Sequence, residues 1–131
     1  AFPSGVKRLV EQLVAMQPSP ESVWLIGSRA NGRATPDSDW DLVVIGSHDL
    51  LRAIKAPEHE SLNHPDVDLL VVTDGDNFES PFDQKYGSLS AWNWDIAESG
   101  QYAKYQGTHW TDDCAGAVSR GERAVRIWTR A

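Results

Sequence analysis

Cysteine is nearly absent from this chain of 131 residues: Cys114 is the only one, so no disulfide can close within the chain. A lone cysteine without an accompanying motif is more often a packing residue than a nucleophile, and it favours a reducing, cytoplasmic location. Long apolar runs are also missing, and no signal-peptide pattern opens the sequence. We therefore expect no association with a membrane.

Positive charge is scarce as well. The chain has 12 lysines and arginines against 19 acidic residues, which gives a net charge of −7. General binding to polynucleotides needs many basic side chains to displace the counterions of the phosphates, so we expect none here. The length suits one domain over residues 1–131 with a single hydrophobic core.

The most informative stretch is Val23–Ile45. It begins with a short, partly β-branched apolar run, Val23–Ile26, which predicts a buried strand that stops at Gly27. The polar residues that follow can form a helical turn with Ser28 near its N-terminus. A second apolar run, Trp40–Ile45, predicts the next strand.

Two carboxylates, Asp39 and Asp41, flank Trp40 at the start of this second strand. Side chains two residues apart on a strand point to the same face, so both carboxylates share one face and Trp40 can pack in the core. Adjacent carboxylates without a basic neighbour repel each other, and a hard divalent cation relieves that repulsion. The pair therefore predicts a metal site that also takes substrate phosphates.

The end of the first strand, at Gly27 and Ser28, supplies the complement to this metal site. Backbone N–H groups at the start of a helical turn attract phosphate, and glycine lets the backbone approach a ligand closely. A third apolar run, Val67–Thr73, predicts a strand that carries one carboxylate, Asp68. Charged residues are rarely buried unless they are paired or bind metal, so we assign Asp68 to the same site.

In this order, Gly27-Ser28, Asp39-Trp40-Asp41 and Asp68 resemble the signature of the nucleotidyltransferase superfamily related to DNA polymerase beta. The order of the elements is similar over most of the chain, in particular to the minimal nucleotidyltransferase domain proteins. The resemblance implies an α+β fold, with a small mixed β-sheet and helices packed mainly on one face.

The resemblance also implies roles for individual residues. Gly27 and Ser28 would hold phosphates of a nucleoside triphosphate, and the guanidinium groups of Arg29 and Arg33 are close enough in sequence to act as further donors. Arg29 is the stronger of these two candidates, and each has an ordinary surface role as its alternative. The chain has Asn31 where the short motif of the family often has a basic residue.

Asp39, Asp41 and Asp68 are implied to be both catalytic residues and metal ligands. They would bind Mg²⁺, as two ions, with Mn²⁺ as an alternative, and Asp68 would help to deprotonate the attacking hydroxyl. A nucleoside monophosphate would pass from the triphosphate, with ATP as the first choice, to a hydroxyl acceptor, and pyrophosphate would leave.

The sequence leaves the acceptor open. Minimal members resemble the antitoxin half of two-component systems, which makes a hydroxyl of a helical toxin partner, and a tyrosine in particular, one candidate. A small-molecule hydroxyl is another, with a homo-oligomer or a partner protein completing the cleft. The alternative from a different class is a catalytically silent module of the same fold that binds and masks a partner protein.

Periodicity and turn residues assign the rest of the chain: helices over residues 4–16, 48–54, 88–99 and 111–130, a turn over 74–80, and a short edge strand over 101–106. The last helix would carry a stripe of arginines: Arg120, Arg123, Arg126 and Arg130. A solvated helix face is the default interpretation of this stripe, and a surface for an acidic partner or RNA is the alternative.

Overall fold

The computed structural model describes residues 2–110 and 117–131, and the side chains of residues 2–107 and 120–131. Within these residues the helices are α1 (Ser4–Val14), η1 (Ser28–Ala30), α2 (His48–Lys55) and η2 (Pro57–Leu62), of which η1 and η2 are 3₁₀ helices. The strands are β1 (Ser22–Ile26), β2 (Trp40–Ile45), β3 (Val67–Val72), β4 (Asn77–Glu79), β5 (Tyr86–Ser88), β6 (Asp95–Ile96), β7 (Tyr102–Trp110) and β8 (Ala117–Thr129).

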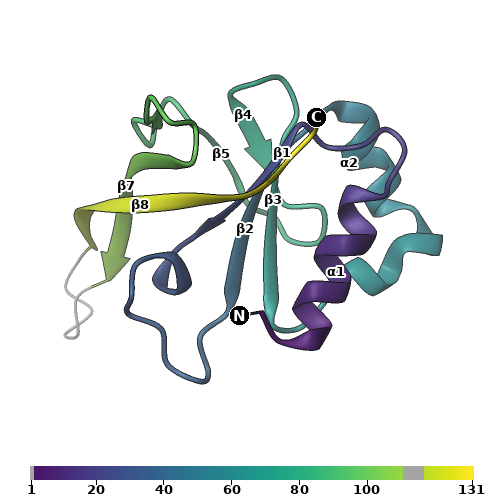
Figure 1. Ribbon diagram of the computed structural model, residues 1–131, viewed down its shortest axis with the longest axis horizontal. Coiled ribbons are helices and arrows are strands. Elements are labelled where there is room, and N and C mark those ends of the chain that lie inside the picture. The colour runs from purple at the N-terminus through teal and green to yellow at the C-terminus, as the bar shows by residue number, and fades with distance from the viewer. Residues whose placement is uncertain (1, 111–116) are drawn as a thin grey trace.

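The strands form an 8-stranded sheet in the order β5-β4-β3-β2-β1-β8-β7-β6. β2 and β3 are parallel, and the other neighbouring pairs are antiparallel. The two edge strands, β5 and β6, are joined through residues 89–94, so the sheet curls until its edges approach each other. Figure 1 shows the curled sheet, with β7 and β8 extending away from α1 and α2.

Alternating strand residues divide the core into two buried clusters. The first cluster joins buried residues of α1, α2 and η2 to one set of strand residues: Val23, Leu25, Leu42, Val44, Leu69 and Val71. The second cluster contains the alternate strand residues, and Trp92 and Trp94 of the β5–β6 connection pack against it. Its buried members are Trp24, Ile26, Val43, Leu70, Val72, Phe78, Leu89, Ala103, Tyr105 and Ala124. The second cluster therefore lies inside the curl of the sheet.

The helix α1 follows from the spacing of its apolar residues. Val6, Leu9 and Leu13 are buried, and they recur at the three- and four-residue intervals of one helix face. α2 begins after Ser47, whose hydroxyl accepts the N–H of Leu50. No helix within the described ranges is long and apolar enough to cross a membrane.

The expected mixed architecture of helices and strands is confirmed. The first helix and the first three strands have nearly the predicted bounds. Buried residues of α1, α2 and η2 belong to the first cluster. The expectation that the helices pack mainly on one face of the sheet stays a prediction. Two expected helices are wrong: residues 88–99 form the end of β5, a series of turns and β6, and residues 117–129 form β8.

The last segment forms a strand because it has a partner on each side. β8 pairs with β1 and with β7, which satisfies backbone N–H and C=O groups along both of its edges. Gly121 lowers the helix propensity of the segment, and the β-branched and aromatic residues after it favour a strand. The arginine stripe is therefore divided between two faces: Arg120 and Arg126 share one, and Arg123 stacks over Tyr102 on the other.

The segment predicted as a helix over residues 88–99 instead closes the curl of the sheet. Asn93 has a φ of 56°, in the left-handed region that interrupts a helix. The N–H of Gln106 donates to the carbonyl of Trp92 at 2.7 Å, which ties this connection to β7. The connection over residues 89–94, between the two edge strands, is too short to hold the predicted helix.

Two smaller expectations also change. Residues 101–106 contribute to a strand, as predicted, but β7 lies between β8 and β6 and is not an edge. The segment over residues 74–80, predicted as a turn, contains β4 as well. The predicted helix start at residues 111–113 and the packing role of Cys114 lie outside the described residues.

Candidate active site

The parallel pair of strands brings the carboxylates of Asp41 and Asp68 together. β2 and β3 run in a register that places Asp41 opposite Asp68. Both residues alternate with strand residues of the first cluster, so both project into the curl of the sheet. Asp39, directly before β2, is exposed. Trp40 packs against the first cluster, on the opposite face, as the alternation predicts.

The surroundings of Asp41 disfavour its negative charge. Burial and the charges of Asp68 and Asp39 raise the pKa of Asp41 from 3.8 to about 6, against an opposing effect of Lys85. Asp41 is therefore close enough to both of the other carboxylates to be repelled by them. A bound divalent cation would relieve this repulsion.

A basic side chain that the sequence analysis missed lies against these carboxylates. The ammonium group of Lys85, just before β5, donates to Oδ2 of Asp68 at 2.7 Å. This hydrogen bond raises the pKa of Lys85 above its ordinary value. Among the residues that the structure describes, no group of three or more His, Cys, Asp or Glu side chains is arranged to hold a metal ion. Asp68 is engaged by Lys85 instead.

Gly27 brings the end of β1 into contact with Asp41. Its φ is 73°, in the left-handed region that glycine adopts without a steric penalty. A Cβ atom at this position would overlap the carboxylate of Asp41. η1 begins at Ser28, directly after the glycine, and both residues line a cavity together with Asp41. The predicted phosphate-binding turn and the carboxylates therefore belong to one site.

Two side chains hold this turn in place. The hydroxyl of Tyr105 on β7 accepts the N–H of Gly27 at 3.0 Å. The side-chain nitrogen of Asn31 donates to the carbonyls of Gly27 at 2.8 Å and Arg123 at 2.9 Å. The side-chain oxygen of Asn31 accepts the N–H of Arg123 at 2.8 Å. Asn31, at the position where a basic residue is common in the family, thus ties η1 to β8.

Arg33 and Glu122 form a further part of the site. The guanidinium group of Arg33 donates to Oε1 of Glu122 at 2.6 Å, and the side chains are 35% and 2% exposed. Gly107 on β7 leaves room for Glu122, because a Cβ atom at Gly107 would lie 2.6 Å from its Cγ. The sequence gives no sign of Glu122 as a site residue, because the spacing of the surrounding arginines predicts a helix. As a strand, the segment would have shown a lone carboxylate two residues from the buried Ala124.

Arg29, which the sequence favours over Arg33 as a phosphate ligand, does not line the cavity at the Gly27-Ser28 turn. Its guanidinium group donates to the carbonyl of Ser38 at 2.8 Å and lies 4.5 Å from the ring centre of Trp40. Arg29 and Trp40 line a different cavity, next to the start of α1. Arg29 therefore holds the loop between β1 and β2, and its role as a phosphate ligand stays a prediction.

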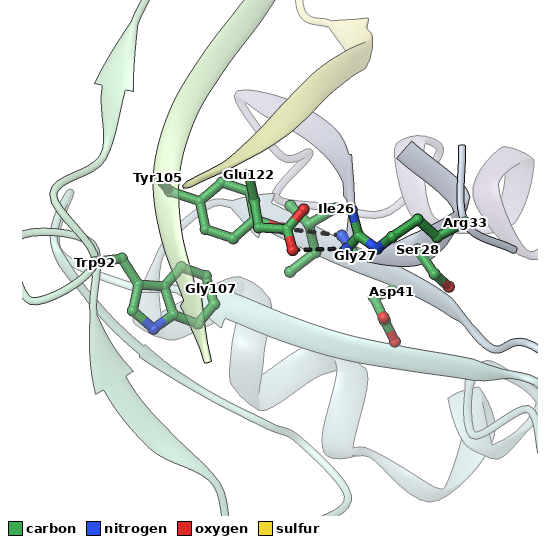
Figure 2. A pocket seen from close by; sticks show the side chains of 9 residues that line it. All are labelled: Ile26, Gly27, Ser28, Arg33, Asp41, Trp92, Tyr105, Gly107 and Glu122. Carbon is green, nitrogen blue, oxygen red and sulfur yellow. Dashed lines mark hydrogen bonds and ion pairs between the residues drawn. The ribbon is translucent and has the colours of Figure 1, made fainter. Parts of the chain in front are cut away.

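A cavity of about 530 Å³ opens at the Gly27-Ser28 turn. Figure 2 shows Arg33 reaching from the turn toward Glu122, with Asp41 nearby and Trp92 at the far end. The polar part of its wall thus combines a backbone turn, a guanidinium group and the carboxylates of Asp41 and Glu122. This combination suits a phosphate-bearing ligand.

A second cavity of about 530 Å³ shares Asp41 and Trp92 with the first. It contains Asp68 and Lys85, and its apolar wall includes Leu70 and Phe78 of the second cluster. Tyr86, which is 74% exposed, also lines this cavity. The two cavities therefore meet at Asp41, one lined by the phosphate turn and the other by the Asp68–Lys85 pair.

A mixed sheet that presents a Gly-Ser turn beside carboxylates of neighbouring parallel strands is the arrangement expected of a nucleotidyltransferase. The sequence family described as the nucleotidyltransferase domain matches residues 6–107. The chain therefore belongs to the nucleotidyltransferase domain family, which indicates nucleotide transfer in general. The whole of β8, including Glu122, lies beyond the matched residues. No curated protein and no solved structure matches the chain significantly.

Proposed function

We propose that this protein transfers a nucleoside monophosphate from a nucleoside triphosphate, with ATP as the first choice, to a hydroxyl acceptor. The observation that supports this proposal is the register of Asp41 and Asp68 beside the turn at Gly27. Enzymes of phosphoryl transfer act mainly by positioning the substrate and stabilising negative charge. This site offers backbone and guanidinium donors for phosphates directly beside oxygen ligands for a cation.

A divalent cation, Mg²⁺ or Mn²⁺, fits the chemistry of this group of residues. Its ligands would be Asp39 and Asp41, with Asp68 beside them, because carboxylate oxygens are the donors that Mg²⁺ prefers. The repulsion that contributes to the raised pKa of Asp41 is the physical basis of the fit. When bound, the cation supplies positive charge opposite the phosphates.

The chain's own residues would bind and orient the triphosphate. Ser28 and Arg33 line the first cavity and would contact the phosphates, and Gly27 allows the close approach. Because Glu122 holds Arg33 through one nitrogen, the other donors of the guanidinium group are left for phosphate oxygens.

The reaction would join the two cavities. The oxygen of the acceptor hydroxyl forms a bond to the α-phosphorus, the bond from that phosphorus to the bridging oxygen breaks, and pyrophosphate leaves. The proton of the hydroxyl passes to a carboxylate, for which Asp68 is the residue that the resemblance implies. Asp68 lines the second cavity, so this cavity would receive the acceptor.

The acceptor remains a choice between two classes. One is a hydroxyl of a helical toxin partner, in which case the protein would act as an antitoxin, and the other is a small-molecule hydroxyl. A homo-oligomer could complete the second cavity in the latter case. These assignments, like a cytoplasmic location, stay predictions from the sequence.

Titration calorimetry with ATP and Mg²⁺ tests the proposal. The wild type should bind ATP only with the metal, and the double variant Asp39→Ala/Asp41→Ala should lose this binding while it remains folded by circular dichroism. Asp49→Ala, which removes an exposed carboxylate of α2 paired with Arg52, is the matched control and should bind as the wild type does. Failure of the wild type to bind any of the four nucleoside triphosphates would overturn the enzyme proposal.

The second candidate function is a catalytically silent module that masks a partner protein. The ion pair of Lys85 with Asp68 favours it, because a carboxylate engaged by lysine is withdrawn from a metal site. Product analysis separates the two candidates. Pyrophosphate released from ATP in the presence of an acceptor supports the enzyme, whereas tight partner binding that survives Asp39→Ala/Asp41→Ala without pyrophosphate release supports the module.

A further inference from the structure

Lys85 reaches the metal-binding carboxylates from a different part of the sheet. It lies just before β5, two strands away from Asp68 on β3, and its ammonium group is 2.7 Å from Oδ2 of Asp68. The Lys85 side chain is 54% exposed and that of Asp68 is 26% exposed. A lysine free to move into solvent is instead directed at a carboxylate inside the second cavity.

The loop before Lys85 is built to hold it there. The N–H of Ser80 donates to the carbonyl of Lys85 at 3.0 Å, which closes the β4–β5 hairpin. The buried hydroxyl of Ser80 accepts the N–H groups of Phe82 and Asp83 at 3.3 and 3.1 Å. The hairpin therefore fixes the backbone of Lys85, and its ammonium group reaches Asp68 from there.

The charges at the site leave room for one divalent cation. Asp39, Asp41 and Asp68 contribute three negative charges when ionised, and Lys85 offsets one of them. In the absence of nucleotide, one divalent cation at Asp39 and Asp41 would neutralise the remainder. A second divalent ion at Asp68 would have to displace the ammonium group or lie beside it, at a cost in charge repulsion.

We propose that the ammonium group of Lys85 takes the place of the second metal ion, so that the protein works with one divalent cation per chain. This inference rests on the proposed function and refines the two ions that the resemblance implies. In this proposal Asp68 binds the ammonium group of Lys85 and accepts the proton of the acceptor hydroxyl, and it does not bind a metal ion. An ammonium group suits this role because it is a compact charge with three donors, of which one contacts Asp68.

The number of bound ions tests this proposal without a measurement of activity. Mn²⁺ is titrated into the full chain with an equimolar non-hydrolysable ATP analogue, free ion is counted by electron paramagnetic resonance, and a titration of the analogue alone is subtracted. The wild type should bind about one Mn²⁺ per chain, and Lys85→Met, which keeps the apolar stem and removes the charge, should bind about two. Lys55→Met is the matched control. Lys55 of α2 pairs with Glu79 of β4, and its substitution should leave the number of bound ions unchanged.

Further variants keep the test decisive. Lys85→Arg retains the charge and should bind one ion, and Asp68→Asn should also retain one, since Asp68 is not a ligand of that ion in this proposal. Two ions in the wild type, or loss of all Mn²⁺ binding in Asp68→Asn, would overturn the role of Lys85 and leave the proposed function standing. Absence of Mn²⁺ binding in the wild type would instead overturn the metal-dependent function itself.

Discussion

The hydroxyl of Tyr105 accepts the backbone N–H of Gly27 at 3.0 Å, so β7 holds the glycine at which the phosphate-binding turn begins. Tyr105 is 5% exposed and makes tilted ring contacts with Trp92 and Trp94, with ring centres 5.4 and 5.8 Å away. The hydrogen bond between Gly27 and Tyr105 joins residues that lie 78 positions apart in the sequence. The position of the turn therefore depends on the curl of the sheet as well as on its own residues.

Tyr105→Phe should destabilise the protein, because it keeps the aromatic packing and removes the acceptor of a partly buried N–H. We expect a loss of about 1 to 2 kcal/mol in the free energy of unfolding. Urea denaturation of the wild type and the variant measures it. Tyr102→Phe, at an exposed tyrosine of the same strand, is the control and should change little. Equal stability of Tyr105→Phe and the wild type would contradict the role of the hydroxyl.

Alkaline pH should weaken the wild type through the same residue. Burial raises the pKa of Tyr105 from 10.0 to about 12 in the folded protein. Because the folded pKa is the higher one, the stabilising contribution is complete below pH 10 and is lost as the pH rises toward 12. Denaturation midpoints measured across this range should fall more steeply for the wild type than for Tyr105→Phe. Parallel pH profiles would show that Tyr105 does not ionise in this way.

Gly27→Ala should damage both stability and nucleotide binding. A Cβ atom at Gly27 would overlap the carboxylate of Asp41, and the φ of 73° disfavours any other residue. Gly32→Ala is the matched control, since Gly32 has a φ of 71° and open space around it. The control should lose about 1 kcal/mol from backbone strain alone, and Gly27→Ala should lose clearly more. Similar unfolding curves for the two variants would show that the contact with Asp41 is unimportant.

Asp41→Asn should stabilise the metal-free protein and abolish nucleotide transfer. It removes a partly buried charge that the carboxylates of Asp68 and Asp39 also repel, and it keeps the shape of the side chain. Allowing for solvent screening, we expect a gain of about 1 to 2 kcal/mol in the free energy of unfolding at neutral pH. Thermal denaturation in the presence of a chelator measures it. A lower melting temperature than that of the wild type would contradict the unfavourable effect of burial and neighbouring carboxylates on the Asp41 charge.

Glu122→Gln should weaken the binding of ATP without changing the number of bound metal ions. The variant takes the negative charge away from the Arg33 guanidinium, so Arg33 is no longer fixed in the first cavity. We expect the Kd for ATP to rise by about tenfold. Arg120→Ala is the control, because Arg120 lies 3.7 Å from the same carboxylate, is half exposed and should contribute little. An unchanged Kd for Glu122→Gln would show that ATP binding does not depend on the ion pair between Arg33 and Glu122.

Local chemistry was sufficient to predict the central part of the fold. The apolar runs that became β1, β2 and β3, the turn at Gly27 and the spacing of Asp39 and Asp41 are properties of short segments. Alternation along a strand fixes which face a side chain takes, so the shared face of Asp41 and Asp68 could be inferred before their register was known.

The second half of the chain shows where this reasoning fails. The same spacing of arginines suits a helix face, yet residues 117–129 form β8 because β1 and β7 provide hydrogen-bonding partners on both sides. Non-local pairing outweighs a weak local preference, since each strand edge left unpaired would bury unsatisfied backbone groups. Residues 88–99 follow the same rule, because they must bridge the two edges of a curled sheet.

The sequence by itself therefore determined the carboxylates, the glycine turn and the family to which they belong, because these are local patterns with fixed spacing. Only the tertiary structure decided which side chains complete the site. Tyr105, Glu122 and Lys85 come from strands and turns remote in the sequence, and they meet the central strands because the sheet curls on itself. Contacts of this kind depend on strand order and register, which no short segment encodes.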